Sequence, residues 1–185
     1  DTAYVRKMIN FIDYMTKEMH RRLPGSIVMW YDSVTIQGEL KWQNALNEKN
    51  KPFFDVCDAI FLNYCWNPTL LQSSVDIAGD RVHDIFTGID IFGRNTYGGG
   101  GFTSHIALQE IQQCGTSTAL FAPGWTFETS ITANASSEAL RLKFEANEAK
   151  FWTGLNYQQL LKNASGNFGL EDWDIIENGG NGWKI

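Results

Sequence analysis

The sequence lacks the features that mark membrane proteins and nucleic-acid-binding proteins. Its apolar runs, such as residues 59–62, are far too short to cross a bilayer. The formal net charge is −6, and the basic residues are scattered, with Arg21 and Arg22 at the end of a predicted helix, where cations complement the dipole. Nucleic acids are bound by clustered Lys and Arg. We therefore expect neither a membrane nor a nucleic acid as a partner.

Cysteine is scarce, and its pattern excludes common metal and redox motifs. Cys57, Cys65 and Cys114 are odd in number and form no Cys-x-x-Cys pair. Cys57 and Cys114 each lie just before a predicted strand, so we expect buried free thiols rather than disulfide bridges. Free thiols favour a reducing compartment, which predicts a cytoplasmic protein.

Several catalytic motifs are also missing. The histidines His20, His83 and His105 do not share metal-ligand spacing. No Gly-x-Ser-x-Gly elbow occurs, so a Ser-His-Asp triad is unsupported. The four glycines at 98–101 are not followed by Lys-Ser or Lys-Thr, which indicates a surface loop rather than a phosphate loop. We expect no metal and no cofactor.

What the sequence does contain is the pattern of an α/β domain. Its 185 residues are 43% hydrophobic and 19% charged, as in a globular protein with a core. Ile27, Val28 and Met29 suit a strand that is buried on both faces, as in a parallel sheet. The chain opens at Asp1 rather than methionine, and we expect it to belong to a longer protein. Helices are predicted over 5–23, 38–47, 67–78, 103–114 and 137–152, and strands begin near Ile27, Ala59, Asp84 and Thr118.

The four predicted strands recur at intervals of about 30 residues, which suits a (β/α)₈ TIM barrel. The spacing also suits a doubly wound sheet. Polar or aromatic residues follow every strand, where barrel active sites lie, and this favours the barrel. Four units make only half a barrel, with two open sheet edges and an uncovered core face. We therefore expect a companion half.

Residues at the strand ends could act on a sugar. Asp32, Asp90, Glu128 and Tyr31 are the ionisable candidates, and paired carboxylates across a cleft are typical of glycoside hydrolysis. Tryptophan rings beside hydrogen-bonding groups match the apolar faces of pyranose rings. Four tryptophans lie near strand ends or in the loops that follow them: Trp30, Trp42, Trp66 and Trp125.

Several longer motifs resemble the endo-β-N-acetylglucosaminidases of glycoside hydrolase family 85. One is Val-Met-Trp-Tyr-Asp-Ser at 28–33, and another is Phe-Leu-Asn-Tyr-Cys-Trp at 61–66. The resemblance keeps its order over about residues 5–160 and continues loosely into the tail at 176–183. The other motifs lie at 40–47, 50–55, 88–94 and 119–125.

The resemblance implies the second half of a (β/α)₈ barrel, strands 5–8 with their helices, over residues 1–160, followed by an irregular exit segment over 161–185. It implies cleavage between the two N-acetylglucosamines of the N-glycan core, with retention. The 2-acetamido oxygen of the substrate would attack to give an oxazolinium ion, the substrate-assisted exception to the two-carboxylate scheme. The family's Asn-x-Glu pair supplies the acid and base, and no Asn-x-Glu occurs in this sequence. We expect it in the companion N-terminal half.

Site roles follow from the same resemblance. Tyr31 matches the family's tyrosine that contacts the reacting acetamide, and it is the expected catalytic residue. Trp42 and Trp66 match aromatic walls on the acceptor side. The other expected substrate contacts are Trp30, Asp32, Asn63, Asp90, Phe92 and Trp125.

The partner would be an N-glycan or a glycoprotein. Two alternatives stay open at this point. One is a lectin-like barrel fragment that binds glycan without cleaving it. The other is an unrelated glycosidase that uses Asp32 with Glu128.

Overall fold

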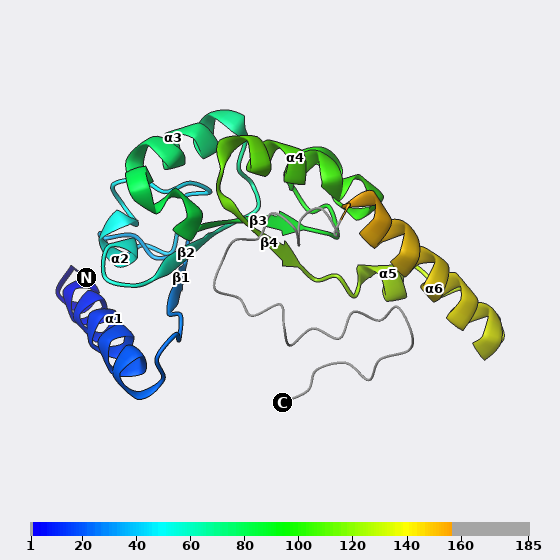
Figure 1. The fold of residues 1–185 in the computed structure, drawn as a ribbon, viewed down its shortest axis with the longest axis horizontal. Coiled ribbons are helices and arrows are strands. Elements are labelled where there is room, and N and C mark those ends of the chain that lie inside the picture. Colours follow the sequence, from blue (N-terminus) through cyan, green and yellow to red (C-terminus); the bar gives the residue numbers. More distant parts are fainter. Residues whose placement is uncertain (1, 157–185) are drawn as a thin grey trace. The chain divides into compact units, whose positions relative to one another are not determined.

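A four-stranded parallel sheet organises the chain. The computed structural model describes residues 2–156. The strands are hydrogen-bonded in the order β1-β2-β3-β4, so neighbours in the sheet are also neighbours in the sequence (Figure 1). This confirms the predicted α/β class with a parallel sheet. The strands are β1 (Met29–Tyr31), β2 (Ala59–Leu62), β3 (Ile85–Asp90) and β4 (Ser117–Phe121).

Helices alternate with the strands and begin and end at local signals. The Asn67 side chain accepts a hydrogen bond from the Leu70 N–H at 2.9 Å, and Pro68 follows it at the first helical position. Gly115 ends another helix in the left-handed region, at φ 78°. The helices are α1 (Thr2–Arg22), α2 (Lys51–Phe54), α3 (Pro68–Ala78), α4 (Ser104–Cys114), α5 (Trp125–Glu128) and α6 (Ser137–Gly154), with 3₁₀ turns η1 (Gly79–Asp84), η2 (Tyr97–Gly99) and η3 (Gly101–Thr103).

The core lies on the helix-covered face of the sheet. Residues paired in a parallel register point to the same face. Trp30, Ile60 and Ile85 therefore share one face, and Leu62 and Ile89 belong to it as well. The isoleucines and Leu62 are fully buried. Figure 1 shows α3 and α4 on the same side of the sheet.

The opposite face of the sheet is exposed on its two edge strands. Tyr31 is 37% exposed and Phe121 42% exposed, on the two edge strands. The expectation of a strand buried on both faces holds for Val28, which is buried, but is wrong for Ile27 and Met29, which are 46% and 37% exposed.

Two further expectations concern chain boundaries. The predicted helix over 38–47 is wrong: this segment is a loop whose only strand-like contact is an antiparallel bridge between Val34 and Leu40. A compact unit extends to Leu155. The expected exit segment, 161–185, lies outside the described residues, so the division at residue 160 stays a prediction.

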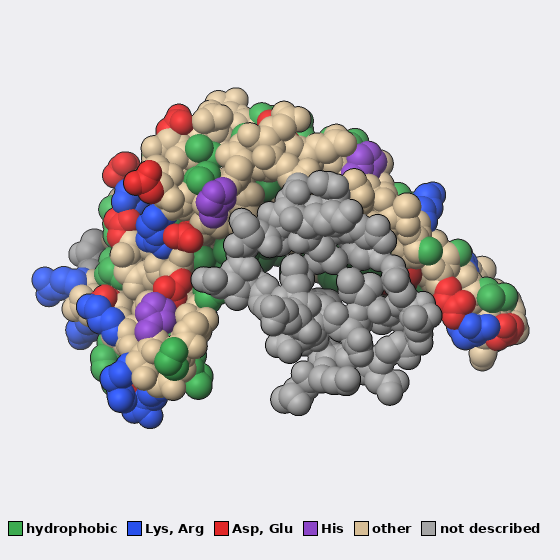
Figure 2. Space-filling view, viewed as in Figure 1, with side chains coloured by type: hydrophobic (Ala, Val, Ile, Leu, Met, Phe, Trp, Pro, Cys, Tyr) green, Lys and Arg blue, Asp and Glu red, His purple; other side chains and the backbone are tan. Residues whose placement is uncertain are grey.

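The described residues show mixed charges on their helices, as the composition predicts, and no membrane-spanning helix. Basic side chains gather over α1, where Glu18 pairs with Arg21 and Arg22. Acidic and basic side chains lie together at the N-terminal end of α6 (Figure 2). None of the helices within residues 2–156 combines the length and apolarity needed to cross a membrane. All three cysteines are free, with Cys57 buried, Cys114 partly buried and Cys65 exposed.

Candidate active site

One edge of the sheet gathers most of the candidate residues. Tyr31 ends β1, Asp90 ends β3 and Phe121 ends β4. Asn63 lies one residue beyond β2, on the same face as Phe61 and hence as Tyr31, with which Phe61 is in register. Because the strands are parallel, their carboxyl ends meet at this edge, and side chains far apart in sequence become neighbours.

Tyr31 lies at the centre of a small polar group. Its hydroxyl donates to Asn63 Oδ1 at 2.9 Å. The indole N–H of Trp42 and the hydroxyl of Tyr64 also interact with the Tyr31 hydroxyl. Burial raises the pKa of Tyr31, and the contacts from Tyr64 and Trp42 offset this only in part. The phenol is therefore neutral at physiological pH and can act as a hydrogen-bond donor or acceptor.

A row of aromatic rings crosses the sheet beside this group. The ring of Tyr31 lies 5.3 Å from that of Phe61, Phe61 lies 6.0 Å from Tyr64, and Tyr64 lies 5.2 Å from Phe121. The Arg94 guanidinium ends the row, 6.0 Å from the Phe121 ring centre. We call Tyr31, Phe61, Tyr64 and Phe121 the aromatic row. Half-buried rings beside hydrogen-bonding groups suit the apolar faces of sugars.

A missing side chain in β3 makes room for the row. A Cβ at Gly88 would lie 2.6 Å from the Leu62 carbonyl oxygen and 2.8 Å from the nearest Tyr64 ring atom. Only glycine lets the Tyr64 ring lie this close to the strand. Tyr64 thereby bridges β2 and β4 across the face of β3.

Asp90 is held by an ion pair rather than left free for catalysis. Its carboxylate is 2% exposed and accepts hydrogen bonds from Arg94 Nε at 2.7 Å and Nη2 at 3.1 Å. Burial acts to raise its pKa, but the Arg94 hydrogen bonds and the Phe92 backbone N–H outweigh it and hold the pKa of Asp90 below its usual value. The same guanidinium lies 5.0 Å from the Phe92 ring centre. Asp90 thus orients Arg94 over the aromatic rings.

Asp32 is fully buried beneath the loop that follows β1. It accepts hydrogen bonds from the backbone N–H groups of Gln43 and Asn44, at 3.1 Å and 2.7 Å, and from the Asn50 side chain at 3.1 Å. Burial raises the pKa of Asp32, and these hydrogen bonds offset the effect in part. Because Asp32 has no exposed surface, it holds the loop in place and does not itself face the space beside Tyr31.

The four candidate tryptophans occupy different environments. Trp30 stacks on Phe53 with ring centres 4.5 Å apart, on the helix-covered face. Trp66 is 3% exposed and donates its indole N–H to the Gly88 carbonyl at 2.7 Å. Trp125 is half-buried and meets Phe102 edge to face, 5.0 Å between centres. Only Trp42, at 48% exposed, stands open beside Tyr31.

The structure gives no support to a catalytic pair of Asp32 and Glu128, because both Asp32 oxygens are occupied and inaccessible. Within residues 2–156, no cluster of three or more His, Cys, Asp or Glu is arranged to hold a metal.

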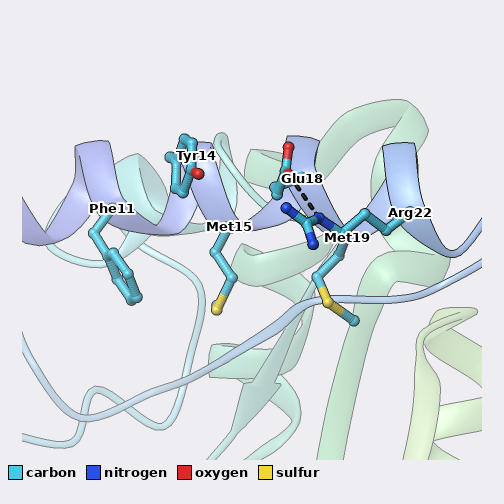
Figure 3. Close-up of a pocket in the computed structure, with 6 residues that line it drawn as sticks. All are labelled: Phe11, Tyr14, Met15, Glu18, Met19 and Arg22. Carbon is cyan, nitrogen blue, oxygen red and sulfur yellow. Dashed lines mark hydrogen bonds and ion pairs between the residues drawn. The ribbon is translucent and has the colours of Figure 1, made fainter.

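A shallow depression of about 140 Å³ lies on α1 among apolar side chains and the Glu18–Arg22 pair (Figure 3). It contains none of the candidate residues.

Sequence reasoning missed five members of this surface. Phe61 and Tyr64 lie in the motif at 61–66, and the alternation of Phe61 with Asn63 is the signal that could have identified Phe61. Asn44 lies in the motif at 40–47, but its contact with Asn63 depends on how the loop folds. The missed residues are Asn44, Phe61, Tyr64, Arg94 and Phe121.

Comparisons with known proteins agree with one family. The family model described as glycosyl hydrolase family 85 matches residues 1–178. A cytosolic endo-beta-N-acetylglucosaminidase 1 of Arabidopsis thaliana is 50% identical over 129 residues, which is 70% of this chain and 19% of that protein. The cytosolic endo-beta-N-acetylglucosaminidase of Mus musculus is 42% identical over 151 residues, 82% of this chain and 19% of that protein.

A solved structure extends the likeness to the fold. The glycoside hydrolase domain of Endo-D from Streptococcus pneumoniae R6 superposes with a TM-score of 0.61 at 22% identity, covering 82% of this chain and 24% of that one. The chain spans about a fifth of the length of the curated relatives it matches. Taken with the family model, these matches mean that the chain belongs to glycosyl hydrolase family 85.

Proposed function

We propose that this chain is part of an endo-β-N-acetylglucosaminidase that cleaves the GlcNAc-β-1,4-GlcNAc core of N-glycans. The observation that carries the proposal is the 50% identity, over 129 residues, to a protein named as a cytosolic enzyme of this activity. The same name supports the cytoplasm as its location. The substrate is an N-glycan or a glycoprotein that bears one.

The fold we propose for the catalytic domain is a (β/α)₈ TIM barrel, of which this chain forms strands 5–8. Four parallel strands in sequential order support the barrel, because a doubly wound sheet reverses its strand order. The open sheet face, with Tyr31 and Phe121 exposed, is the side that a companion half would cover.

The mechanism we propose is substrate-assisted, with retention of configuration. The 2-acetamido oxygen attacks the anomeric carbon, and the leaving sugar takes a proton from the Glu of an Asn-x-Glu pair in the companion half. The neutral phenol of Tyr31 hydrogen-bonds the cyclising acetamide, and water or a sugar acceptor then opens the oxazolinium ion. Trp42 and the aromatic row bind sugar rings, and Arg94 contributes hydrogen bonds at their rim.

The direct test is to incubate the full-length protein with an N-glycosylated peptide. The expected product is peptide that retains a single N-acetylglucosamine, with the remaining glycan released, as measured by mass spectrometry. Glycan binding without release would support the lectin alternative instead. Release of the entire glycan, including both N-acetylglucosamines, would contradict the proposal.

Replacing Tyr31 with Phe is expected to lower hydrolysis by about tenfold, the loss of one transition-state hydrogen bond of about 1.4 kcal/mol. The ratio of hydrolysis to transfer onto a sugar acceptor should change as well, because both reactions open the same intermediate. Product quantification with and without acceptor measures both effects. Glu128→Gln is the control and should change turnover only modestly. An unchanged ratio in Tyr31→Phe would count against its role.

Two tryptophans should separate binding from stability. Trp42→Ala is expected to raise KM about tenfold, through the loss of an exposed stacking surface, with little change in thermal stability. Trp66→Phe should instead lower the unfolding free energy by about 1–3 kcal/mol, because it removes the buried indole N–H that donates to the Gly88 carbonyl. Steady-state kinetics and urea denaturation distinguish the two. A stability loss in Trp42→Ala equal to that in Trp66→Phe would contradict this assignment.

A further inference from the structure

Hydrogen bonds link three side chains into a chain of contacts: Asn44 in the loop after β1, Asn63 after β2 and Tyr31 at the end of β1. Asn63 Nδ2 donates to Asn44 Oδ1 at 2.6 Å, and Asn63 Oδ1 accepts from the Tyr31 hydroxyl at 2.9 Å. An amide has a distinct donor end and acceptor end, and with Nδ2 donating to Asn44 the acceptor end of Asn63 faces the tyrosine. The phenol proton is thereby directed toward Asn63, and the phenol oxygen is left to accept a hydrogen bond from the acetamide N–H.

Buried Asp32 fixes both asparagines of this chain. Its carboxylate accepts the Asn44 backbone N–H at 2.7 Å and also interacts with the backbone N–H of Asn63. Asn44 adopts the left-handed region at φ 56°, a conformation that asparagine tolerates better than most residues. A single inaccessible carboxylate therefore sets the separation between residues that are 19 positions apart.

Packing alone leaves the Tyr31 side chain loosely specified. It ends a strand of three residues at the edge of the sheet, and it is 37% exposed. Its ring contact within the aromatic row is a tilted one with Phe61. A hydrogen bond at the hydroxyl is the contact that can fix both the ring direction and the proton.

We infer that Asn63, held by Asn44 and Asp32, is the positioning residue of Tyr31 rather than a contact to the sugar. The inference rests on the proposed function, since it assigns Asn63 a part in the same reaction. A displacement of the phenol by a fraction of an ångström would weaken the bond to the acetamide as it cyclises. Asn63 should accordingly influence the reaction rate only through the position of the Tyr31 hydroxyl.

A double-mutant cycle in the full-length protein tests this dependence. Asn63→Ala is expected to lower kcat about fivefold to tenfold with little change in KM. In the Tyr31→Phe background, the same substitution should have almost no further effect, because the hydroxyl it positions is gone. An equal loss in both backgrounds would overturn the inference. So would a loss confined to KM, which would mean direct contact with the sugar.

Matched variants separate positioning from folding. Asn10→Ala removes an asparagine that is exposed on α1 and should leave both constants unchanged. Asn44→Ala should lower kcat by less than Asn63→Ala does. In the Tyr31→Phe background, Asn44→Ala should cause almost no further loss. A full-strength effect of Asn44→Ala in the Tyr31→Phe background would contradict the chain of contacts.

A second measurement does not depend on catalysis. With 3-fluorotyrosine at position 31, a ¹⁹F NMR titration follows the ionisation of this phenol. Loss of the Asn63 acceptor destabilises the neutral phenol, so Asn63→Ala should lower its pKa by about half to one pH unit. An unchanged pKa would overturn the inference. If the wild-type protein cleaves no glycan, the proposed function fails while this titration still decides the role of Asn63.

Discussion

Asp32→Ala is expected to lower the unfolding free energy by about 3–5 kcal/mol, because it strands several buried donors at once. The carboxylate is fully buried and accepts hydrogen bonds from Gln43, Asn44 and Asn50. Water cannot replace it without opening the loop over 38–47. Urea denaturation of wild type and variant measures the difference.

Two comparison variants make the Asp32 prediction specific. Asp55→Ala removes an exposed carboxylate that pairs with Lys51 on α2, and it should cost no more than about 0.5 kcal/mol. Asp32→Asn keeps one acceptor oxygen but turns an amide NH₂ toward the other donors, so its cost should fall between the two. If Asp32→Ala unfolds at the same urea concentration as Asp55→Ala, the loop does not depend on Asp32.

Gly88→Ala is expected to destabilise the protein by about 3 kcal/mol, as overpacking against a backbone atom does at its upper range. The added Cβ would lie 2.6 Å from the Leu62 carbonyl oxygen in the neighbouring strand. Rotation of a side chain cannot relieve that contact, so β2 and β3 must separate. The variant should also displace the Tyr64 ring and raise KM for glycan substrates.

The matched control is Gly124→Ala, since Gly124 has an ordinary helical φ of −56° and no atom within 4 Å of an added Cβ. Its unfolding free energy should stay within about 0.5 kcal/mol of wild type. Thermal melts and steady-state kinetics of both variants provide the comparison. Equal stability of the two variants would mean that β2 and β3 tolerate a wider spacing than their register implies.

Local signals were enough to predict most of the secondary structure. Asn67 and Pro68 marked the start of α3, and Gly115 marked the end of α4, because caps depend on a few adjacent residues. β2 begins at the expected residue, Ala59, and the other strands begin within two residues of expectation. Periodicity along one chain is sufficient for such features.

Features that depend on contacts between residues far apart in the sequence could not be predicted from such local signals. The segment 38–47 has helix-forming residues, but Asp32 captures its backbone N–H groups and holds it as a loop. Trp30 and Trp42 are the same residue type, and nothing in their identity tells them apart. In the structure Trp30 stacks on Phe53 in the core, whereas Trp42 is exposed. Trp30 faces the core because it is in register with Ile60, and this register cannot be read from the composition.

The sequential order of the strands also bears on how the chain is made. Within residues 2–156, each strand pairs only with strands that are its neighbours in the sequence. At about 5–20 residues per second, a ribosome completes a unit of about 30 residues every few seconds, and each new strand finds its partner already in place. The sheet can therefore grow from one edge during translation, without waiting for a distant segment to emerge.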